Sequence, residues 1–347
     1  VVTDKPLRDL GVVDAAIANL NSADVNVHIF DGVLPDPTFE HVAAGARAAR
    51  ENNSDTVLAI GGGSSIDAAK IICASATSDE DPAQWVGFGK FKHEPLALYA
   101  IPTTSGTGSE ATIGGVISDP ITHQKSIIAA PGLLPAAAAL DPDLLVGLPP
   151  HITAATGLDA LTHGIEAYIG TWDRGTRKED ARIAIKLVFD YLAIACRDGE
   201  NKEARNGVAM GAYYAGLAIN QVNVGNVHAI AHQLGGKYGI PHGLANALVL
   251  PHIMEFCVQE SMSEFAELAV MIGAGQAGES ENDLAGKFIQ AVRDLRTEVG
   301  IADTSDKIQR ADFDALCDAA MAEGMGYPSP RLLDRENTLL ILGKIAP

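Results

Sequence analysis

Apolar and polar positions alternate in two different ways along this chain of 347 residues. In the first part, short runs rich in β-branched residues are separated by helical stretches, an order that is typical of βαβ units and a parallel sheet. We expect strands over residues 1–2, 25–30, 56–60 and 96–101, with a strand-like pair near 113–118 and 125–129. We expect helices over residues 7–20 and 37–52 and from residue 64 onward. This pattern predicts an α/β fold with a Rossmann-like, doubly wound parallel sheet.

The second part of the chain is helical in pattern throughout and has no β-rich run. Apolar positions recur there at helical spacing, which predicts an all-helical domain. We expect helices over residues 151–169, 178–197, 201–219, 226–236, 243–259, 262–274, 281–298 and 311–323. Two consecutive prolines, Pro149 and Pro150, mark the boundary, because they stop a strand and can open a helix. The predicted domains are therefore residues 1–147 and residues 148–347.

A glycine-rich turn follows the third predicted strand. Gly61, Gly62 and Gly63 let the backbone come close to a pyrophosphate, and the next helix offers unpaired N–H groups and the positive end of its dipole. Ser64 can cap this helix, with Asp67 at the third helical position of a capping box. The three glycines do not have the GxGxxG spacing of the usual dinucleotide-binding motif. The alternative interpretation of this segment is a tight, well-capped turn that binds no ligand.

A second loop, dense in hydroxyl groups and glycines, follows the strand predicted over 96–101. Thr103, Thr104 and Thr107 in this loop are suited to hold phosphate and ribose oxygens, although the composition also fits an ordinary polar loop. Two such loops at the carboxyl ends of parallel strands border the crevice in which α/β proteins bind their ligands. Together the two loops favour a dinucleotide site.

Carboxylate and imidazole groups at helical spacing are the most specific feature of the second part. Two pairs of residues are four positions apart, so that each pair shares one helix face. The pairs are Asp159 with His163 and His228 with His232, and His242 follows. One aspartate and three histidines from separate segments can form a nitrogen- and oxygen-ligated site for Fe²⁺, Zn²⁺, Mn²⁺ or Ni²⁺. A lone histidine is more often only hydrogen-bonded than bound to a metal. We interpret His252 as a polar residue near a helix start after Pro251 rather than as a ligand.

Composition narrows the choice of partners. The 25 basic and 44 acidic residues give a formal net charge of −19, which repels phosphate backbones and anionic membrane surfaces. We therefore expect no nucleic-acid partner, and no apolar run reaches the length of a membrane span. The cysteines form no CxxC pair, which predicts reduced thiols and a cytoplasmic protein. They are Cys73, Cys196, Cys257 and Cys317.

In order along nearly the whole chain, these motifs resemble those of the iron-containing (group III) alcohol dehydrogenases. The matching segments are Thr3-Asp4-Lys5, Gly61-Gly62-Gly63-Ser64-x-x-Asp67, Pro102-Thr103-Thr104-x-Gly106-Thr107, Gly157-Leu158-Asp159-Ala160-Leu161-Thr162-His163, His228-x-x-x-His232-x-Leu234-Gly235 and Pro241-His242-Gly243-x-Ala245-Asn246. The resemblance implies the dehydroquinate synthase-like fold of these enzymes, with a dinucleotide-binding first domain and a metal-binding catalytic second domain. It also implies a homodimer. Family members carry residues before the position of Val1, so we expect the first strand to be incomplete here.

The resemblance also implies roles for individual residues. The metal ligands of the family correspond to Asp159, His163, His228 and His242, and His232 corresponds to a residue that lines the nicotinamide and relays protons. Asp4 matches an acidic residue at the adenosine ribose that disfavours a 2′-phosphate, so NAD is expected rather than NADP. Asp36, in the loop after the second strand, is expected to reinforce that preference. The full set implied for the cofactor is Asp4, Gly61, Gly62, Gly63, Ser64, Asp67, Thr103, Thr104, Thr107 and Lys125.

The leading prediction is an NAD-dependent alcohol dehydrogenase that interconverts a small primary alcohol or diol and its aldehyde, with Fe²⁺, Zn²⁺ or another divalent metal. The metal would lower the pKa of the alcohol, from which a hydride passes to the nicotinamide. A glycerol dehydrogenase-like enzyme is the nearest alternative, but those enzymes use fewer histidine ligands. A lyase of the dehydroquinate synthase type would need a cluster of basic residues, and Lys237 is the only lysine or arginine between 215 and 245. The non-enzymatic alternative is a metal-binding protein without turnover.

Overall fold

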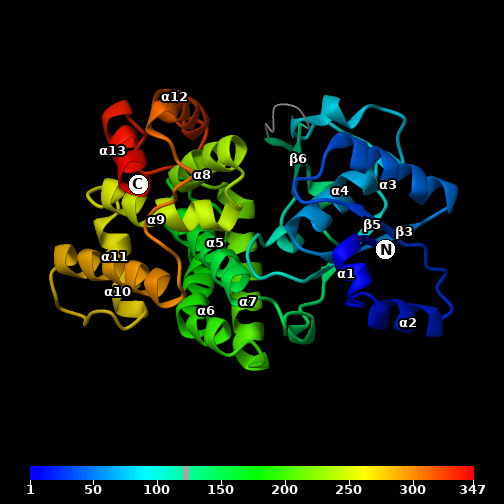
Figure 1. Ribbon diagram of the computed structural model, residues 1–347, viewed down its shortest axis with the longest axis horizontal. Helices are drawn as coiled ribbons and strands as arrows, with labels where there is room; N and C mark the ends of the chain where they lie inside the picture. The colour runs from blue at the N-terminus through cyan, green and yellow to red at the C-terminus, as the bar shows by residue number, and fades with distance from the viewer. Residues whose placement is uncertain (120–124) are drawn as a thin grey trace. The chain divides into compact units, whose positions relative to one another are not determined.

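The computed structural model describes residues 1–119 and 125–347. These residues form two compact units, Val1–Leu145 and Val146–Pro347, which Figure 1 draws in blue to green and in green to red respectively. All the described strands lie in the first unit. The nine α-helices from α5 to α13 lie in the second unit. The predicted fold class, a parallel sheet followed by a helical domain, is confirmed.

The first unit contains a five-stranded sheet in the order β2-β1-β3-β5-β8, and every neighbouring pair in it is parallel. Its strands are β1 (Val2–Asp4), β2 (Phe30–Val33), β3 (Thr56–Gly61), β5 (Ala97–Pro102) and β8 (Ala137–Ala138). A three-stranded sheet in the order β4-β7-β6 accompanies it. Its strands are β4 (Gly87–Phe88), β6 (Gly114–Ser118) and β7 (Lys125–Ala129), of which β6 and β7 pair antiparallel.

Four α-helices lie among the described residues of this unit, and α4 is the most deeply buried of them. They are α1 (Lys5–Asp9), α2 (Asp14–Ser22), α3 (Phe39–Glu51) and α4 (Gly63–Ala76), and single 3-10 turns lie at Pro82–Trp85, Ser109–Ala111, Pro131–Leu133 and Pro142–Leu144. All residues of α4 from Ser65 through Ser75 except Asp67 are buried, because the helix packs against β3, β5 and β6 at once. It therefore fixes the turn that joins it to β3.

Two sequence-based predictions for this unit are wrong in their bounds. The helix expected over 7–20 is two helices, because Gly11 adopts a φ of 74° between α1 and α2. The strand expected over 25–30 begins only at Phe30, where its backbone N–H donates to the carbonyl of Val1 at 2.8 Å. Residues 25–29 have no strand partner in the described chain, since β1 begins at Val2.

The second unit is built from helices alone over residues 146–347, all of which the structure describes. They are α5 (Pro150–Ile169), α6 (Arg177–Arg197), α7 (Lys202–Val222), α8 (Asn226–Tyr238), α9 (His242–Cys257), α10 (Met262–Met271), α11 (Glu281–Glu298), α12 (Phe313–Gly324) and α13 (Arg335–Ile345), with a 3-10 turn at Arg310–Asp312. Pro149 is the N-cap of α5 and Pro150 its first residue, which confirms that the proline pair opens a helix. The sequence pattern missed α13.

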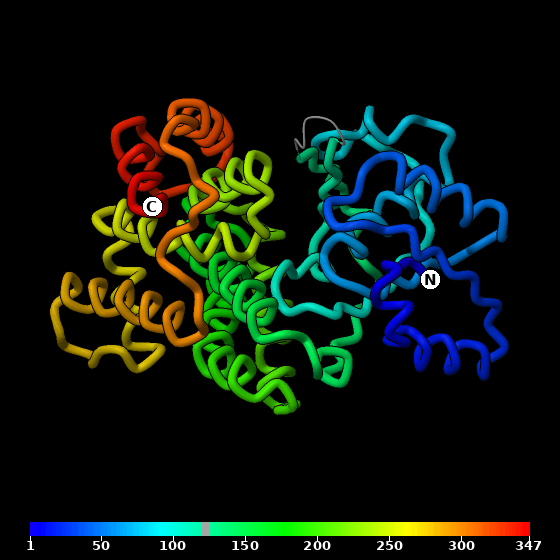
Figure 2. Tube along the Cα trace, viewed as in Figure 1, coloured from blue at the N-terminus to red at the C-terminus, as the bar shows by residue number. Residues whose placement is uncertain are grey.

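The α5 helix is the centre of the second unit, and Figure 2 shows its green trace among α6 and α7. Its residues are buried without interruption from Gly157 to Ile169. Gly157 and Gly164 lie against α6, where an added Cβ would collide with Leu192 or lie 3.0 Å from Ile185. These glycines let α6 approach one side of α5 closely and leave the other side to face α8 and α9. None of the described helices combines the length and apolarity needed to cross a lipid bilayer.

Candidate active site

A stripe of three ionisable side chains follows the face of α5 directed toward α8 and α9. Asp159, His163 and Glu166 are separated by four and three positions, a spacing that aligns side chains on one helix face. All three are buried. Such groups are buried in proteins only when they have partners, and α8 and α9 supply them.

Two further histidines join this stripe from separate helices. His228 lies in the first turn of α8 and His242 is the first residue of α9. Gly243 allows the start of α9 to reach α5, because a Cβ at this position would collide with the carbonyl of Ala155. His242 is therefore a helical residue and not the loop residue that its position after Pro241 suggests.

The four predicted metal ligands converge on one point. Asp159, His163, His228 and His242 each offer one ligand atom, and these atoms all lie within 4.8 Å of one another. The Nε2 atoms of His163 and His228 are 3.0 Å apart, and Asp159 Oδ1 lies 3.4 Å from His242 Nε2. The side chains of Asp159, His163 and His228 are at most 5% exposed, whereas that of His242 is 29% exposed. The cluster is thus closed on three sides and open at His242.

The charge balance of the cluster suits a divalent cation. Burial alone would raise the pKa of Asp159, but the three histidines and a hydrogen bond from Asn246 outweigh it, so that the pKa is lowered. An ionised carboxylate therefore faces imidazole nitrogens in a buried space. One carboxylate oxygen and three imidazole nitrogens form a donor set that Fe²⁺ and Zn²⁺ both accept. The residues present fit a bound metal.

Asn246 brings an amide group to the same point. Its side chain is fully buried, and Nδ2 donates to Asp159 Oδ1 at 2.6 Å. The same atom lies 3.1 Å from His228 Nε2 and 3.2 Å from His242 Nε2. The amide thus orients the carboxylate and closes the cluster on the α9 side.

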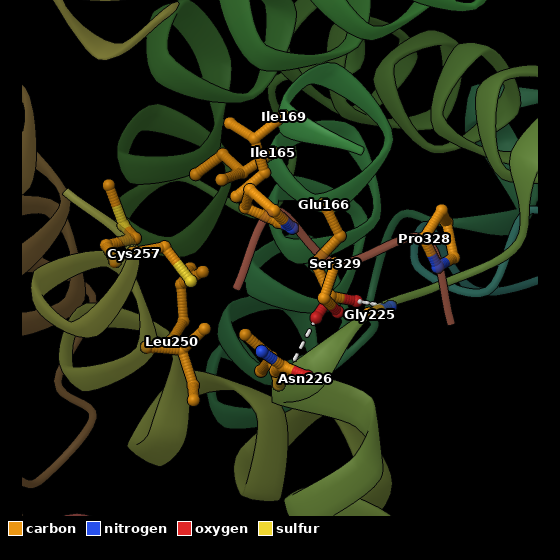
Figure 3. Close-up of a pocket in the computed structure, with 13 residues that line it drawn as sticks. Ile165, Glu166, Ile169, Gly225, Asn226, Leu250, Cys257, Pro328 and Ser329 are labelled. Carbon is orange, nitrogen blue, oxygen red and sulfur yellow. Dashed lines mark hydrogen bonds between the residues drawn. The ribbon is translucent and has the colours of Figure 1, made fainter. Parts of the chain in front are cut away.

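Glu166 meets the beginning of α8. Figure 3 shows its carboxylate directed toward Gly225, beside an apolar cavity lined by Ile165, Ile169 and Leu250. Its oxygens accept the backbone N–H groups of Gly225 at 2.8 Å and Val227 at 2.6 Å, and Oε2 lies 2.5 Å from His228 Nδ1. Burial raises the pKa of Glu166 to about 7, although these backbone bonds oppose the rise.

His232 lies beside the cluster but outside it. Its ring stacks on that of His242 with centroids 5.4 Å apart and meets His228 edge-on at 5.6 Å. Nδ1 of His232 is 2.5 Å from Glu323 Oε1 on α12, and Gln233 and Tyr327 also donate to Glu323. Burial would raise the pKa of Glu323, but the bond with His232 contributes most to a net lowering. An imidazole held by a carboxylate is an arrangement suited to proton transfer.

His252 is not part of the cluster, as expected from the sequence, but the helix start expected after Pro251 is wrong. It lies inside α9, which continues through Pro251, and its Nδ1 is 3.7 Å from Glu255. Burial and the positive charges of Arg293 and Lys344 lower the pKa of His252 to about 4. The histidine is therefore neutral at neutral pH.

The two predicted cofactor loops of the first unit lie against each other. The backbone N–H of Thr103 donates to Gly61 O at 3.0 Å. A Cβ at Gly62 would lie 3.3 Å from Thr104 Oγ1, and one at Gly63 would lie 2.6 Å from Thr107 Cγ2. The glycines are thus needed for the hydroxyl-rich loop to reach the start of α4. This places hydroxyl groups next to the N-terminus of a 14-residue helix, a position that favours anions.

The capping box predicted for α4 is wrong. Gly62 is the N-cap and Ser64 lies inside the first helical turn. Asp67 instead turns away from the helix start, where its carboxylate accepts from Ser109 Oγ at 2.5 Å and from Val116 N at 3.0 Å. Asp67 therefore stabilises the loop that carries Thr103, Thr104 and Thr107, and it does not cap the start of α4.

Lys70 holds the same loop. It is fully buried and donates to Ser109 Oγ at 2.8 Å, Thr112 Oγ1 at 3.0 Å and Gly114 O at 2.6 Å. Burial lowers the pKa of Lys70 to about 8, against the opposite effect of Asp67. Burial also raises the pKa of Glu110 in this loop to about 7. The buried hydrogen bonds of Lys70 thus fix the position of this loop.

Asp4 and Lys125 have partners within the first unit. Asp4 ends β1 and is the N-cap of α1, where Oδ1 accepts from Leu7 N at 2.9 Å. Lys125 begins β7, and its Nζ lies 3.3 Å from Asp36 Oδ1. The Asp36 carboxylate, expected near a ribose, is therefore paired with the lysine in this structure.

Comparison with known proteins agrees with this geometry. The model of the iron-containing alcohol dehydrogenase family matches residues 1–142, and the model of its C-terminal domain matches residues 153–346. The chain belongs to the iron-containing alcohol dehydrogenases. Members of this family are oxidoreductases that interconvert alcohols or diols and aldehydes and use NAD(H) and iron.

Individual members of the family are similar to the chain over nearly all of its length. Alcohol dehydrogenase 4 of Saccharomyces cerevisiae is 36% identical over 348 residues, which cover 99% of this chain and 90% of the yeast protein. The 1,3-propanediol dehydrogenase of Klebsiella pneumoniae is 37% identical, covering 95% of this chain and 87% of that protein. A crystal structure of a 1,3-propanediol oxidoreductase superposes with a TM-score of 0.95 at 37% identity, covering 99% of this chain and 90% of the other.

Four residues that contact the candidate sites of this alcohol dehydrogenase were assigned no role from the sequence. Glu166 continues the stripe of Asp159 and His163, and Asn246 is four residues after His242, so extending the helical spacing could have found both. Lys70 and Glu323 offer no such signal. Glu323 is 91 positions from His232, and only the folded chain brings them together.

Proposed function

We propose that Asp159, His163, His228 and His242 hold the divalent metal of this alcohol dehydrogenase and that the substrate is a small primary alcohol or diol. The observation that carries the proposal is the convergence of four ligand atoms within 4.8 Å in a cluster that is open at His242. A divalent metal in this cluster, Fe²⁺ or alternatively Zn²⁺, would lower the pKa of an alcohol and polarise an aldehyde carbonyl.

Side chains around the metal motifs support the substrate class. Ile219, Val222 and Val224 precede α8 and are apolar, and Lys237 is the only lysine or arginine between 215 and 245. A substrate with a phosphate or carboxylate would lack a cationic partner there. The relatives named for 1,3-propanediol support a small diol among the substrates.

We propose NAD as the cofactor of the first unit. It would accept the hydride that leaves the alcohol carbon. Asp4 would accept from the ribose hydroxyls and repel a 2′-phosphate, and backbone N–H groups at the start of α4 would bind the pyrophosphate. The residues proposed to contact the cofactor are Asp4, Gly61, Gly62, Gly63, Ser64, Asp67, Thr103, Thr104, Thr107 and Lys125.

His232 is the proposed proton relay. Its ring lies between the ring of His242 and the carboxylate of Glu323, and its side chain is 24% exposed. This position lets it receive the alcohol proton on the side of the cluster and release it toward solvent. Glu323 would hold the ring in one orientation through Nδ1.

Two further expectations belong to the proposal. We propose a homodimer, as the resemblance implies. We propose a reducing, cytoplasmic location because all four cysteines are in the described chain and none forms a disulfide.

The experiment that tests the metal assignment replaces one ligand on α9. We expect His242→Ala to lower both metal content and turnover while the fold persists, because His242 is the most exposed of the four ligands. His252→Ala on the same helix is the matched control and should keep the metal. Equal metal stoichiometry in purified His242→Ala and the unmodified enzyme would refute the assignment.

A further inference from the structure

A buried carboxylate that is not among the four proposed ligands contacts one of them. Glu166 is 5% exposed, and its Oε2 lies 2.5 Å from Nδ1 of His228. The other ring nitrogen of His228, Nε2, is the one that faces His163 and Asp159. Glu166 thus acts on the side of His228 that is turned away from the cluster.

Backbone geometry sets the direction of this hydrogen bond. Gly225 N and Val227 N can only donate, and they occupy Oε2 and Oε1 of Glu166 at 2.8 Å and 2.6 Å. Both oxygens thus accept hydrogen bonds as those of an ionised carboxylate do, which favours a proton on His228 Nδ1 in the short contact. A neutral imidazole with its proton on Nδ1 has a free lone pair on Nε2. That lone pair is the one available to a metal.

We propose that Glu166 is a positioning residue of the metal centre, which fixes the tautomer and the ring orientation of His228 and joins it to the helix that carries Asp159 and His163. Carboxylate partners of this kind orient histidine ligands and strengthen their binding to metals. Among the four proposed ligands, Glu166 orients His228 only. Among the described residues, the buried Nδ1 of His163 has no hydrogen-bond partner.

The close approach of α8 to Glu166 depends on a glycine. Gly225 is the N-cap of α8, and a Cβ there would lie 2.9 Å from Glu166 Oε1. The carboxylate therefore bonds to the first turn of α8 and to His228 in that same turn. It also sits at the positive end of the helix dipole, where a negative charge is favoured. A single side chain of α5 thus sets both the start of α8 and the direction of its ligand.

The test rests on the proposed metal site and measures binding rather than turnover. Metal-free enzyme is titrated with Co²⁺, whose visible absorption reports coordination, and the dissociation constant is obtained by competition with a chelator. We expect Glu166→Gln to raise the Co²⁺ dissociation constant by about 10–100-fold. The amide must present its NH₂ group either to Val227 N–H or to Gly225 N–H and His228 Nδ1. The first orientation loses the hydrogen bond from Val227 N. The second places a donor against His228 Nδ1 and therefore favours the tautomer in which His228 Nε2 carries the proton.

Two further variants separate positioning from a general loss of stability. Asn226→Ala removes a 2.7 Å bond to Arg331 O at the same helix end and should lower the melting temperature without changing the Co²⁺ constant. Gly225→Ala keeps the carboxylate but pushes it from α8, so it should weaken Co²⁺ binding. An unchanged Co²⁺ constant in both folded Glu166→Gln and folded Gly225→Ala, or an equal loss in Asn226→Ala, would overturn the role of Glu166. Failure of the unmodified enzyme to bind Co²⁺ would instead overturn the metal site itself.

Discussion

The two candidate sites of this chain are built in opposite ways. In the second unit, side chains from α5, α8 and α9 supply donor atoms that converge within 4.8 Å. In the first unit, the turn before α4 and the loop after β5 approach each other because side chains are missing at Gly62 and Gly63. The metal site should therefore be sensitive to atoms that are removed. The dinucleotide site should be sensitive to atoms that are added.

The largest effect is expected from a removal beside the metal site. His232→Ala should lower turnover by about 10²-fold, at the lower end of what general acid–base groups contribute, because water can partly replace a proton relay. Metal content and NAD affinity should stay unchanged, since the four ligands remain. Steady-state kinetics and metal analysis of the purified variant measure all three quantities.

A neighbouring residue provides the control for this removal. Gln233 also donates to Glu323, at 2.7 Å, but does not take part in the ring contacts of His232. Gln233→Ala should therefore keep turnover close to that of the unmodified enzyme. If His232→Ala lost its metal, the histidine would be a ligand, and if it lost only stability, the relay assignment would be wrong.

An addition in the first unit is expected to have the next largest effect. A Cβ at Gly63 would lie 2.6 Å from Thr107 Cγ2, closer than real Cβ contacts, so Gly63→Ala must displace the Thr107 side chain of the hydroxyl-rich loop. Overpacking of this kind costs about 1–3 kcal/mol. We expect the NADH dissociation constant, measured by fluorescence, to rise about tenfold or more, since each 1.4 kcal/mol is a factor of ten.

The adjacent glycine distinguishes crowding from a general effect on the turn. A Cβ at Gly62 would lie 3.3 Å from the side chain of Thr104, a much milder contact than that at Gly63, so Gly62→Ala should change NADH binding much less. Both variants should bind Co²⁺ normally. Equal NADH affinity in Gly63→Ala and the unmodified enzyme would show that the loop contact does not shape the dinucleotide site.

The same contrast explains what the sequence could predict. The ligands Asp159 and His163 are four residues apart on one helix, so their common face follows from helical geometry alone. The βαβ pattern likewise predicts the parallel sheet, because the alternation of strands and helices is visible in local segments of the sequence. Roles that depend on a distant partner could not be inferred. His232 meets Glu323 only because α12 packs on α8.

Local signals also failed where tertiary contacts compete with them. Ser64 and Asp67 have the residue types and the spacing of a capping box, yet Asp67 bonds to Ser109 and Val116. Buried Lys70, beside Asp67 on the same helix, favours this arrangement because it needs acceptors in that loop. The strand expected over 25–30 has good β-formers, but only Phe30 reaches a pairing partner. Propensity favoured a strand over residues 25–30, but the lack of a pairing partner limited it to Phe30.

The smallest effect is expected from a histidine of the second unit that lies outside the metal site. His242 and His252 share α9, and His252 faces Glu255 of the same helix, Arg293 and Arg296 of α11, and Lys344 of α13. Burial and these cations lower its pKa from 6.5 to about 4. The folded state therefore binds a proton less readily than the unfolded state. His252 stabilises the fold above pH 6.5, and this contribution is lost as the pH falls toward 4.

His252→Gln removes this titration and leaves the four ligands in place. Melting temperatures of both proteins are compared at pH 7 and pH 5.5 in metal-free form, so that protonation of the ligands cannot release a metal in one of them. At pH 5.5 the unmodified chain should have lost about 1 kcal/mol of the advantage that it has over the variant at pH 7, or about 2–4 °C. A constant difference in melting temperature between the two proteins would mean that His252 titrates alike in the folded and unfolded chains. In that case burial among cations would not be what distinguishes His252, the neutral histidine of α9, from His242, the proposed metal ligand of the same helix.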